Sequence, residues 1–217
     1  MKIRSVLLFL CILIFATMAM SQTMIIHTQT GTQTIRLSDI VNITFTDSGG
    51  EMVTDIDGNT YRTVKIGDQV WMAENLKVTK YRNGEAIPHI VDASAWANQS
   101  AGAWCAYDNN DTYVATYGRL YNWYAVADPR GLAPAGWHIP SDAEWKQLEM
   151  FLGMSQSEAD KLGERGSDQG GQLKESGTAH WYSPNAGATN TSGFTGLPGG
   201  HRYDYGHFGL IGDACGF

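Results

Sequence analysis

Apolar residues recur at helical spacing in the middle of this 217-residue chain, at Trp145, Leu148, Phe151 and Leu152. Side chains at this spacing share one face of a helix. Ser141 and Glu144 precede the run, and at this separation each side chain can accept a hydrogen bond from the other residue's backbone N–H. Gly153 follows the run, as is typical of a helix C-terminus. The pattern predicts a capped helix between Ser141 and Gly153, and a shorter helix over residues 156–162.

Strand-like runs separated by turn signals follow the start of the main domain. Residues 57–59, Asp-Gly-Asn, are typical of a hairpin turn, and runs of strand character follow over residues 60–66 and 70–76. The Asp-x-Asp-Gly order at this turn lacks the spacing of an EF-hand loop, so we expect a plain turn rather than a calcium loop. From residue 178 onward Gly, Asn, Ser, His and Tyr dominate, which predicts long loops.

The first 50 residues carry two different patterns. Residues 1–21 combine a basic start, a short apolar run and a small-residue exit, which is typical of a secretory signal peptide. Residues 22–50 predict a short β-rich segment and a linker, with strands over 24–28, 34–37 and 40–45. The remaining sequence contains no segment that is apolar and long enough to span a membrane. We therefore expect an exported chain whose main domain covers residues 51–217.

Composition narrows the class of protein. Charged residues make up 17% of the chain and glycine occurs 25 times, a mixture that favours a loop-rich extracellular β or α+β protein over a helical one. The net charge is −7 without a Lys/Arg cluster, which argues against nucleic acid and anionic membrane surfaces as partners. Removal of residues 1–21 would leave Cys105 and Cys215, so at most one disulfide can form. A bridge and two separate thiols are both consistent with the sequence.

Six phrases occur in order along the main domain: Thr54–Tyr61, Val70–Lys77, Tyr81–Gly84, Tyr117–Val126, Gly136–Pro140 and Gly193–Gly200. Together they resemble the Fibrobacter succinogenes major paralogous domain, a family of exported bacterial domains. The resemblance implies a variant of the C-type lectin fold, preceded here by the small N-terminal β segment. The family's association with bacterial surfaces and fibre-degrading organisms suggests adhesion or carbohydrate contact. Such domains continue into further strands after the Gly-rich phrase, so the resemblance also implies a C-terminally truncated domain.

Catalysis is weakly supported by the residues. The segment Ile139–Trp145 also resembles formylglycine-generating sulfatase-modifying enzymes, which use cysteines in their C-terminal half. Neither Cys105 nor Cys215 lies in a motif that matches that active site. Scattered histidines lack metal-ligand spacing, at His138, His180, His201 and His207. The sequence therefore favours a non-catalytic protein, with a degenerate or divergent relative of these enzymes as the alternative.

One acidic turn offers oxygen ligands for a cation. Asp108, Asn110 and Asp111 are weak candidates for a Ca²⁺ site, because hard cations prefer such oxygens. Consecutive Asp and Asn residues are also typical of ordinary surface turns, and this second interpretation is favoured. The expectation is therefore that the protein carries no metal or other cofactor.

The loop-rich last third is the predicted ligand-binding region. Trp181, Tyr203 and Tyr205 offer flat aromatic faces for sugar rings, and an extended backbone would place both tyrosine rings on one face. Arg202 and Asp204 would contact hydroxyls at the edge. The alternative is that these rings pack beneath the loops.

Four further tryptophans fall within strand or helix patterns, and we expect them in the core: Trp71, Trp123, Trp137 and Trp145. Taken together, the sequence predicts an exported, non-catalytic binding module of a bacterial cell surface. Its expected partners are glycans or other surface proteins.

Overall fold

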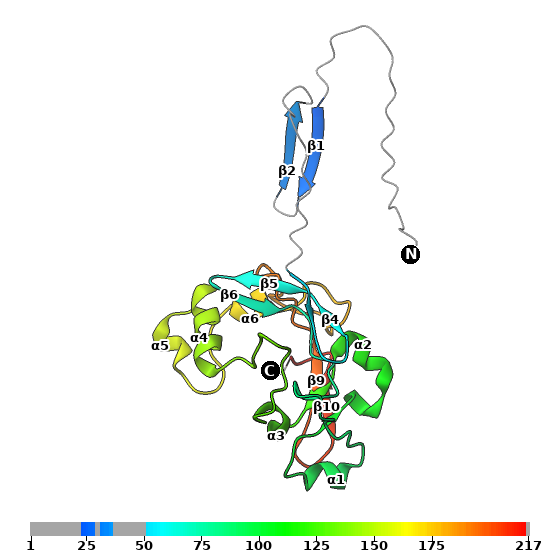
Figure 1. The fold of residues 1–217 in the computed structure, drawn as a ribbon. Helices are drawn as coiled ribbons and strands as arrows, with labels where there is room; N and C mark the ends of the chain where they lie inside the picture. Colours follow the sequence, from blue (N-terminus) through cyan, green and yellow to red (C-terminus); the bar gives the residue numbers. More distant parts are fainter. Residues whose placement is uncertain (1–22, 29–30, 37–50, 216–217) are drawn as a thin grey trace, which may run out of the picture. The chain divides into compact units, whose positions relative to one another are not determined.

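A computed structural model describes residues 23–28, 31–36 and 51–215 of the chain (Figure 1). By backbone contacts the chain divides into two units, Met1–Asp47 and Ser48–Phe217. In the first unit β1 (Thr23–Thr28) pairs antiparallel with β2 (Gly31–Arg36), which confirms two of the three strands predicted there. The predicted third strand, the signal peptide and the linker lie outside the described residues.

The second unit is a mixed, loop-rich structure of short helices and small antiparallel sheets. Its described strands pair two by two: β3 (Val53–Thr54) with β4 (Thr60–Tyr61), β5 (Thr63–Ile66) with β6 (Gln69–Met72), β7 (Trp104–Cys105) with β8 (Leu120–Tyr121), and β9 (Gly199–Arg202) with β10 (Phe208–Ile211). Its helices are α1 (Ala93–Ala97), η2 (Tyr107–Asn109), η3 (Asp111–Tyr113), α2 (Val114–Tyr117), α3 (Trp123–Val126), α4 (Asp142–Phe151), α5 (Gln156–Ala159) and α6 (Gln169–Leu173). None of the helices in the described part of the chain has the length and apolar character needed to cross a membrane.

The β3–β4 hairpin is organised by the buried carboxylate of Asp55. Its Oδ1 accepts hydrogen bonds from the backbone N–H groups of Asp57 and Asn59, each at 2.9 Å. Its Oδ2 accepts a hydrogen bond from the Tyr61 hydroxyl at 2.6 Å. Gly58 has φ +85°, a conformation that costs glycine little and other residues more. The Asp55 side chain therefore builds the turn predicted at residues 57–59.

Helix α4 begins with the predicted capping box. The Ser141 N–H donates to Glu144 Oε2 at 2.8 Å, and the Glu144 N–H donates to Ser141 Oγ at 3.4 Å. Gly153 follows the helix at φ +101°. Phe151, which was predicted to share the apolar face of this helix, is 63% exposed and lies beside Gly67. The helix is confirmed, but of the four apolar residues predicted to share one face only Leu148 is fully buried. The shorter predicted helix is confirmed as α5, which ends earlier than the pattern suggested.

Three apolar clusters form the core of the second unit. One packs α4 against the β5–β6 hairpin (Figure 1), through Ile66, Trp71, Leu148 and Phe194. A second surrounds the β7–β8 pair, through Val78, Tyr81, Ile87, Trp104, Ala125 and Leu132. A third joins Trp96, Ala103 and Cys105. Two rings of the first cluster, Trp71 and Phe194, also line the cavity described below. Packing of this cluster therefore determines where that cavity lies.

Trp123 is an exception to the predicted core. It is 73% exposed, whereas Trp71 is 8% exposed and Trp145 packs against the first cluster. Helix α3 buries Ala125 instead. Successive side chains point in different directions around a helix, so the neighbouring Trp123 and Tyr124 face solvent. The expectation that Trp123 belongs to the core is therefore wrong.

Candidate functional site

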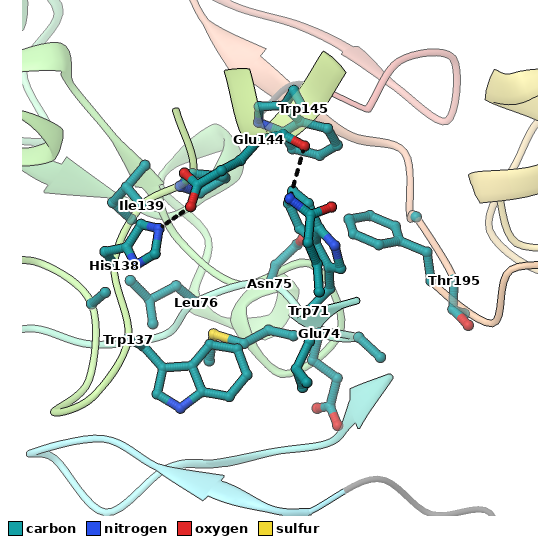
Figure 2. A pocket seen from close by; sticks show the side chains of 18 of the residues that line it. Trp71, Glu74, Asn75, Leu76, Trp137, His138, Ile139, Glu144, Trp145 and Thr195 are labelled. Atoms are coloured by element: carbon teal, nitrogen blue, oxygen red, sulfur yellow. Dashed lines mark hydrogen bonds and ion pairs between the residues drawn. The ribbon is translucent and has the colours of Figure 1, made fainter. Parts of the chain in front are cut away.

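A cavity of about 430 Å³ opens beside the first apolar cluster, the one that packs α4 against the β5–β6 hairpin (Figure 2). Four segments line it, namely residues 69–76, Ala133 with residues 136–140, the α4 residues Glu144 and Trp145, and residues 194–197. These segments are distant in sequence, so the cavity exists only once the β5–β6 hairpin, the loop before α4 and the 194–197 segment pack together.

Three aromatic rings form one wall of the cavity. The Trp71 and Trp145 rings lie 4.8 Å apart between centroids with planes tilted by 45°. Phe194 meets both rings edge to face, at 6.0 Å from each. Trp71 comes from β6, where its neighbour Val70 is exposed, so the strand alternation turns the indole inward. The three rings are therefore held in place by packing in the first core cluster, on the side of the wall that faces away from the cavity.

Trp137 borders the cavity from the loop before α4, and Arg82 fastens this loop. The Arg82 guanidinium donates from Nε to the Ala133 carbonyl at 3.0 Å and from Nη2 to the Trp137 carbonyl at 2.7 Å. The Trp137 N–H in turn donates to the Pro134 carbonyl at 3.0 Å. The Arg82 side chain thus holds the backbone of this loop, and the loop backbone carries the Trp137 ring to the cavity.

His138 and Glu144 form a polar pair on the rim, visible in Figure 2. His138 Nε2 lies 2.7 Å from Glu144 Oε1, while the other carboxylate oxygen accepts from the backbone and hydroxyl of Ser141. Hydrogen bonds from the Ser141 backbone, the Ser141 hydroxyl and His138 lower the pKa of Glu144 to about 2. The carboxylate is thus ionised at neutral pH and is a poor general acid.

Glu74 is the second carboxylate in the lining. Its Oε1 accepts from Arg62 Nε at 3.2 Å and its Oε2 lies 3.4 Å from Lys77 Nζ. Partial burial raises the pKa of Glu74, but hydrogen bonds from the Arg62 backbone and side chain and the charge of Lys77 outweigh it, so the pKa is lowered. No Lys or Arg belongs to the cavity lining, as far as the described residues extend.

Trp181, the first of the ligand-binding residues predicted from the sequence, is buried. It is 6% exposed, its Nε1 donates to the Gly196 carbonyl at 3.1 Å, and Lys174 Nζ lies 4.2 Å from its ring centroid. A ring covered on its faces and edge cannot stack on a sugar. The expectation that Trp181 faces solvent is therefore wrong, and the alternative of packing beneath the loops holds for this residue.

The two predicted tyrosines lie together, in a different geometry from that expected. Tyr203 and Tyr205 stack with centroids 5.0 Å apart and planes only 9° from parallel. They sit on the turn between β9 and β10, where the Tyr203 N–H donates to the His207 carbonyl, so the backbone is not extended. Each ring covers one face of the other, and no flat two-ring platform forms. Tyr205 itself is 57% exposed.

The predicted edge residues serve the same turn. Arg202 donates from Nε to the Gly206 carbonyl at 2.9 Å, and its two terminal nitrogens donate to the carbonyls of Ile90 and Val91. Its guanidinium also lies over Trp96, 4.5 Å from the ring centroid. Asp204 Oδ1 accepts from the Tyr205 N–H at 2.8 Å. Arg202 therefore joins the β9–β10 turn to the segment of Ile90 and Val91.

The candidate Ca²⁺ residues form a turn. Asp108 has φ +52°, and Asn110 Oδ1 accepts from the Thr112 N–H at 3.1 Å and the Thr112 hydroxyl at 2.9 Å. Asp111 begins η3 immediately after this cap. Within the described ranges, no cluster of three or more His, Cys, Asp or Glu side chains is arranged to hold a metal ion. Turn formation accounts for these residues.

Cys105 and Cys215 carry free thiols. Of the two possibilities left open by the sequence, the structure has two separate thiols. Burial raises the pKa of Cys105, and it raises the pKa of Cys215 to about 12. Both thiols therefore stay protonated at neutral pH.

The cavity residues were not predicted as a site from the sequence. Trp71, Trp137 and Trp145 were expected in the core. Trp71 belongs to the first core cluster and Trp145 packs against it, whereas Trp137 is half-buried and lies outside all three clusters, so the expectation is wrong for Trp137. A usable signal was nevertheless present, because three of the six family-like phrases supply most of the lining: Val70–Lys77, Gly136–Pro140 and Gly193–Gly200. Phrases that converge on one cavity indicate a shared site more strongly than exposed aromatics in a single loop.

The family model for the Fibrobacter succinogenes major domain matches residues 64–217, a range that contains every residue lining the cavity. No curated protein and no solved structure matches the chain.

Proposed function

The chain belongs to the Fibrobacter succinogenes major domain family, and we propose that it is an exported, non-catalytic module that binds a glycan in the cavity beside α4. The observation that carries this proposal is the combination of aromatic walls from Trp71, Trp137 and Trp145 with a polar rim. Aromatic faces bury the apolar faces of sugar rings, while rim groups reach hydroxyls. The volume of about 430 Å³ lies within the roughly 300–1,000 Å³ that is usual for small-molecule sites.

Export, surface location and the C-type-lectin-like variant of the fold belong to the same proposal. They are supported by the signal-peptide pattern of residues 1–21 and by the resemblance of the six phrases. A surface protein remains the second proposed partner, and the exposed ring of Tyr205 is the contact we propose for it. Mass measurement of the exported protein tests the proposed export, since cleavage of the signal peptide after Ser21 would leave Gln22 as the first residue.

The alternative function, a divergent sulfatase-modifying enzyme, would need a reactive cysteine. The nucleophilic form of cysteine is the thiolate. Because burial raises the pKa of both Cys105 and Cys215, neither thiol is activated at neutral pH. This observation favours the binding module over the enzyme.

A glycan array with matched tryptophan variants tests the proposal. Trp137→Ala removes a cavity wall without touching the core clusters, and Trp123→Ala removes an exposed indole that lies outside the lining. We expect the wild-type chain to bind a defined set of glycans, and Trp137→Ala to weaken binding by roughly 1–3 kcal/mol, as for an aromatic anchor. Trp123→Ala should leave it unchanged. Absence of any bound glycan, or equal losses in both variants, would refute the proposal.

A further inference from the structure

Strand β6 is paired along one edge only, because β5 and β6 form a two-stranded antiparallel sheet of their own. In such a pair, positions that exchange main-chain hydrogen bonds alternate with positions that do not. The Ala73 N–H donates to the Arg62 carbonyl at 2.8 Å, so by the register of the pair Met72 and Val70 occupy the positions in between. The main-chain N–H and C=O groups of Val70 and Met72 therefore point away from β5.

The outer edge of β6 is open and unprotected. The main chain of Val70 and Met72 makes no hydrogen bond along this edge with any residue that the structure describes. Val70 is 52% exposed and Met72 is half-buried, so neither residue is enclosed. Exposed edges are usually protected by charged side chains or proline, and the β6 sequence Gln-Val-Trp-Met contains neither. The edge thus offers two donors and two acceptors to another chain.

The cavity runs along this same edge. Its lining includes every residue from 69 to 76 and none of the β5 residues, which places it on the side of β6 that faces away from β5. Apolar side chains also line it from the facing loop, where Ile139 is 39% exposed and Trp137 is half-buried. Alternate side chains of a strand point to opposite faces, so a strand laid against β6 would direct one of them into the cavity.

We propose that β6 binds an extended segment of a partner protein by strand addition, with one large apolar or aromatic side chain of that segment in the cavity. The inference goes beyond the proposed glycan binding and gives the second proposed partner, a surface protein, its binding mode. Main-chain hydrogen bonds to Val70 and Met72 supply affinity that does not depend on the partner's sequence, and the cavity supplies selectivity. Donors and acceptors that repeat every second residue along the edge match an extended backbone better than they match a sugar ring.

A blocked heptapeptide, acetyl-Lys-Thr-Val-Phe-Val-Thr-Lys-amide, is the probe. It alternates side chains as a strand does, and its central Phe is the side chain for the cavity. By isothermal titration calorimetry we expect the purified full chain to bind it, and to bind the peptide with Ala in place of Phe about tenfold more weakly, as for loss of an aromatic anchor. Absence of binding would overturn the inference, because the main-chain contacts require no particular sequence. Equal affinities for the two peptides would overturn the role of the cavity.

Amide hydrogen exchange identifies the edge in the unaltered chain. Without peptide, the Val70 and Met72 amides should exchange faster than the Ala73 amide, which is bonded to Arg62. With the heptapeptide bound, we expect exchange at Val70 and Met72 to slow by about tenfold or more while Ala73 changes little. Bound peptide without this alternating protection would contradict strand addition. A dimer in which both amides are already protected without peptide would assign the edge to a second copy of the chain and would also overturn the inference.

Two proline variants separate the edges of the hairpin. Val70→Pro removes an outward N–H from β6, and Lys65→Pro removes the corresponding N–H from β5, since Lys65 lies opposite Val70. Neither N–H takes part in the β5–β6 pairing, and proline is tolerated at such edge positions. We expect Val70→Pro to weaken heptapeptide binding by about tenfold or more, whereas Lys65→Pro leaves it unchanged. Equal effects of the two variants would refute the assignment to β6, and the exchange measurement decides the matter if Val70→Pro does not fold.

The glycan array distinguishes this inference from the proposed function. Heptapeptide binding together with an array that shows no bound glycan would retain strand addition and remove the glycan proposal. Array binding that depends on Trp137, without heptapeptide binding, would do the reverse. If both ligands bind, they should compete, because each occupies the cavity beside β6. Simultaneous binding would contradict the placement of the peptide side chain in that cavity.

Discussion

Glu144 links the start of α4 to the rim of the cavity, and Glu144→Gln tests how much its charge stabilises the protein. The carboxylate accepts hydrogen bonds from the Ser141 backbone and hydroxyl, both at 2.8 Å, and lies 2.7 Å from His138 Nε2. It also stands in the first turn of the helix, where a negative charge interacts favourably with the helix dipole. Gln retains the shape and part of the capping box, so the substitution isolates the charge.

The lowered pKa of Glu144 sets the size and the pH range of the effect. A fall from the ordinary 4.5 to about 2 would correspond to about 3 kcal/mol if solvent did not weaken it. The side chain is 34% exposed, so we discount this to about 1 kcal/mol. Because the pKa is lower in the folded state, the stabilisation is present above about pH 4.5 and is lost as the pH falls through about 2.

Thermal unfolding of wild-type and variant protein across pH measures this effect. At pH 7 we expect Glu144→Gln to lower the melting temperature by roughly 2–4 °C, the shift that about 1 kcal/mol gives in a unit of this size. The difference should shrink progressively between about pH 4.5 and about pH 2. Glu164→Gln, which removes an exposed loop carboxylate, is the control and should show no such difference. A deficit that is unchanged at low pH, or absent at pH 7, would refute the reasoning.

Two further predictions concern the fold. Tyr61→Phe removes the hydroxyl that donates to the buried Asp55 carboxylate and accepts from the Lys77 N–H, so we expect a loss of about 2 kcal/mol in urea unfolding; an unchanged midpoint would show that these groups find other partners. Gly118→Ala places a Cβ 2.7 Å from neighbouring backbone and side-chain atoms at φ +72° and should cost more than about 1 kcal/mol. Gly163→Ala, at φ +80° in open space, isolates the backbone strain, and equal losses for the two glycines would contradict the predicted clash.

Local signals in the sequence were sufficient where an element is stabilised by its own neighbours. The capping box of α4 needs only Ser141 and Glu144, which are three residues apart, and the structure forms it as predicted. The β3–β4 turn needs only Asp55 and the next few N–H groups, together with a glycine at positive φ. In both cases the hydrogen-bond partners are adjacent in the chain, so the pattern of residue types determines the local geometry.

The candidate site could not be predicted in the same way. Trp181 lies between turn residues and resembles an exposed loop aromatic, but its Nε1 bonds the Gly196 carbonyl and Lys174 covers its ring. Tyr203 and Tyr205 alternate in sequence, yet the β9–β10 turn stacks their rings on each other. Exposure of a loop aromatic depends on which distant segment passes over it, and periodicity carries no information about that.

The sequence by itself determined the family, the mixed loop-rich class and the capped helix, because each follows from ordered phrases, composition or contacts within a few residues. Tertiary structure decided which tryptophans are available to a ligand. Trp71, Trp137 and Trp145 border one cavity only because β6, the Arg82-fastened loop and α4 pack together. Packing between remote segments buries one face of such a ring and leaves another open, a distinction that is made by the whole fold and not by the residues beside it.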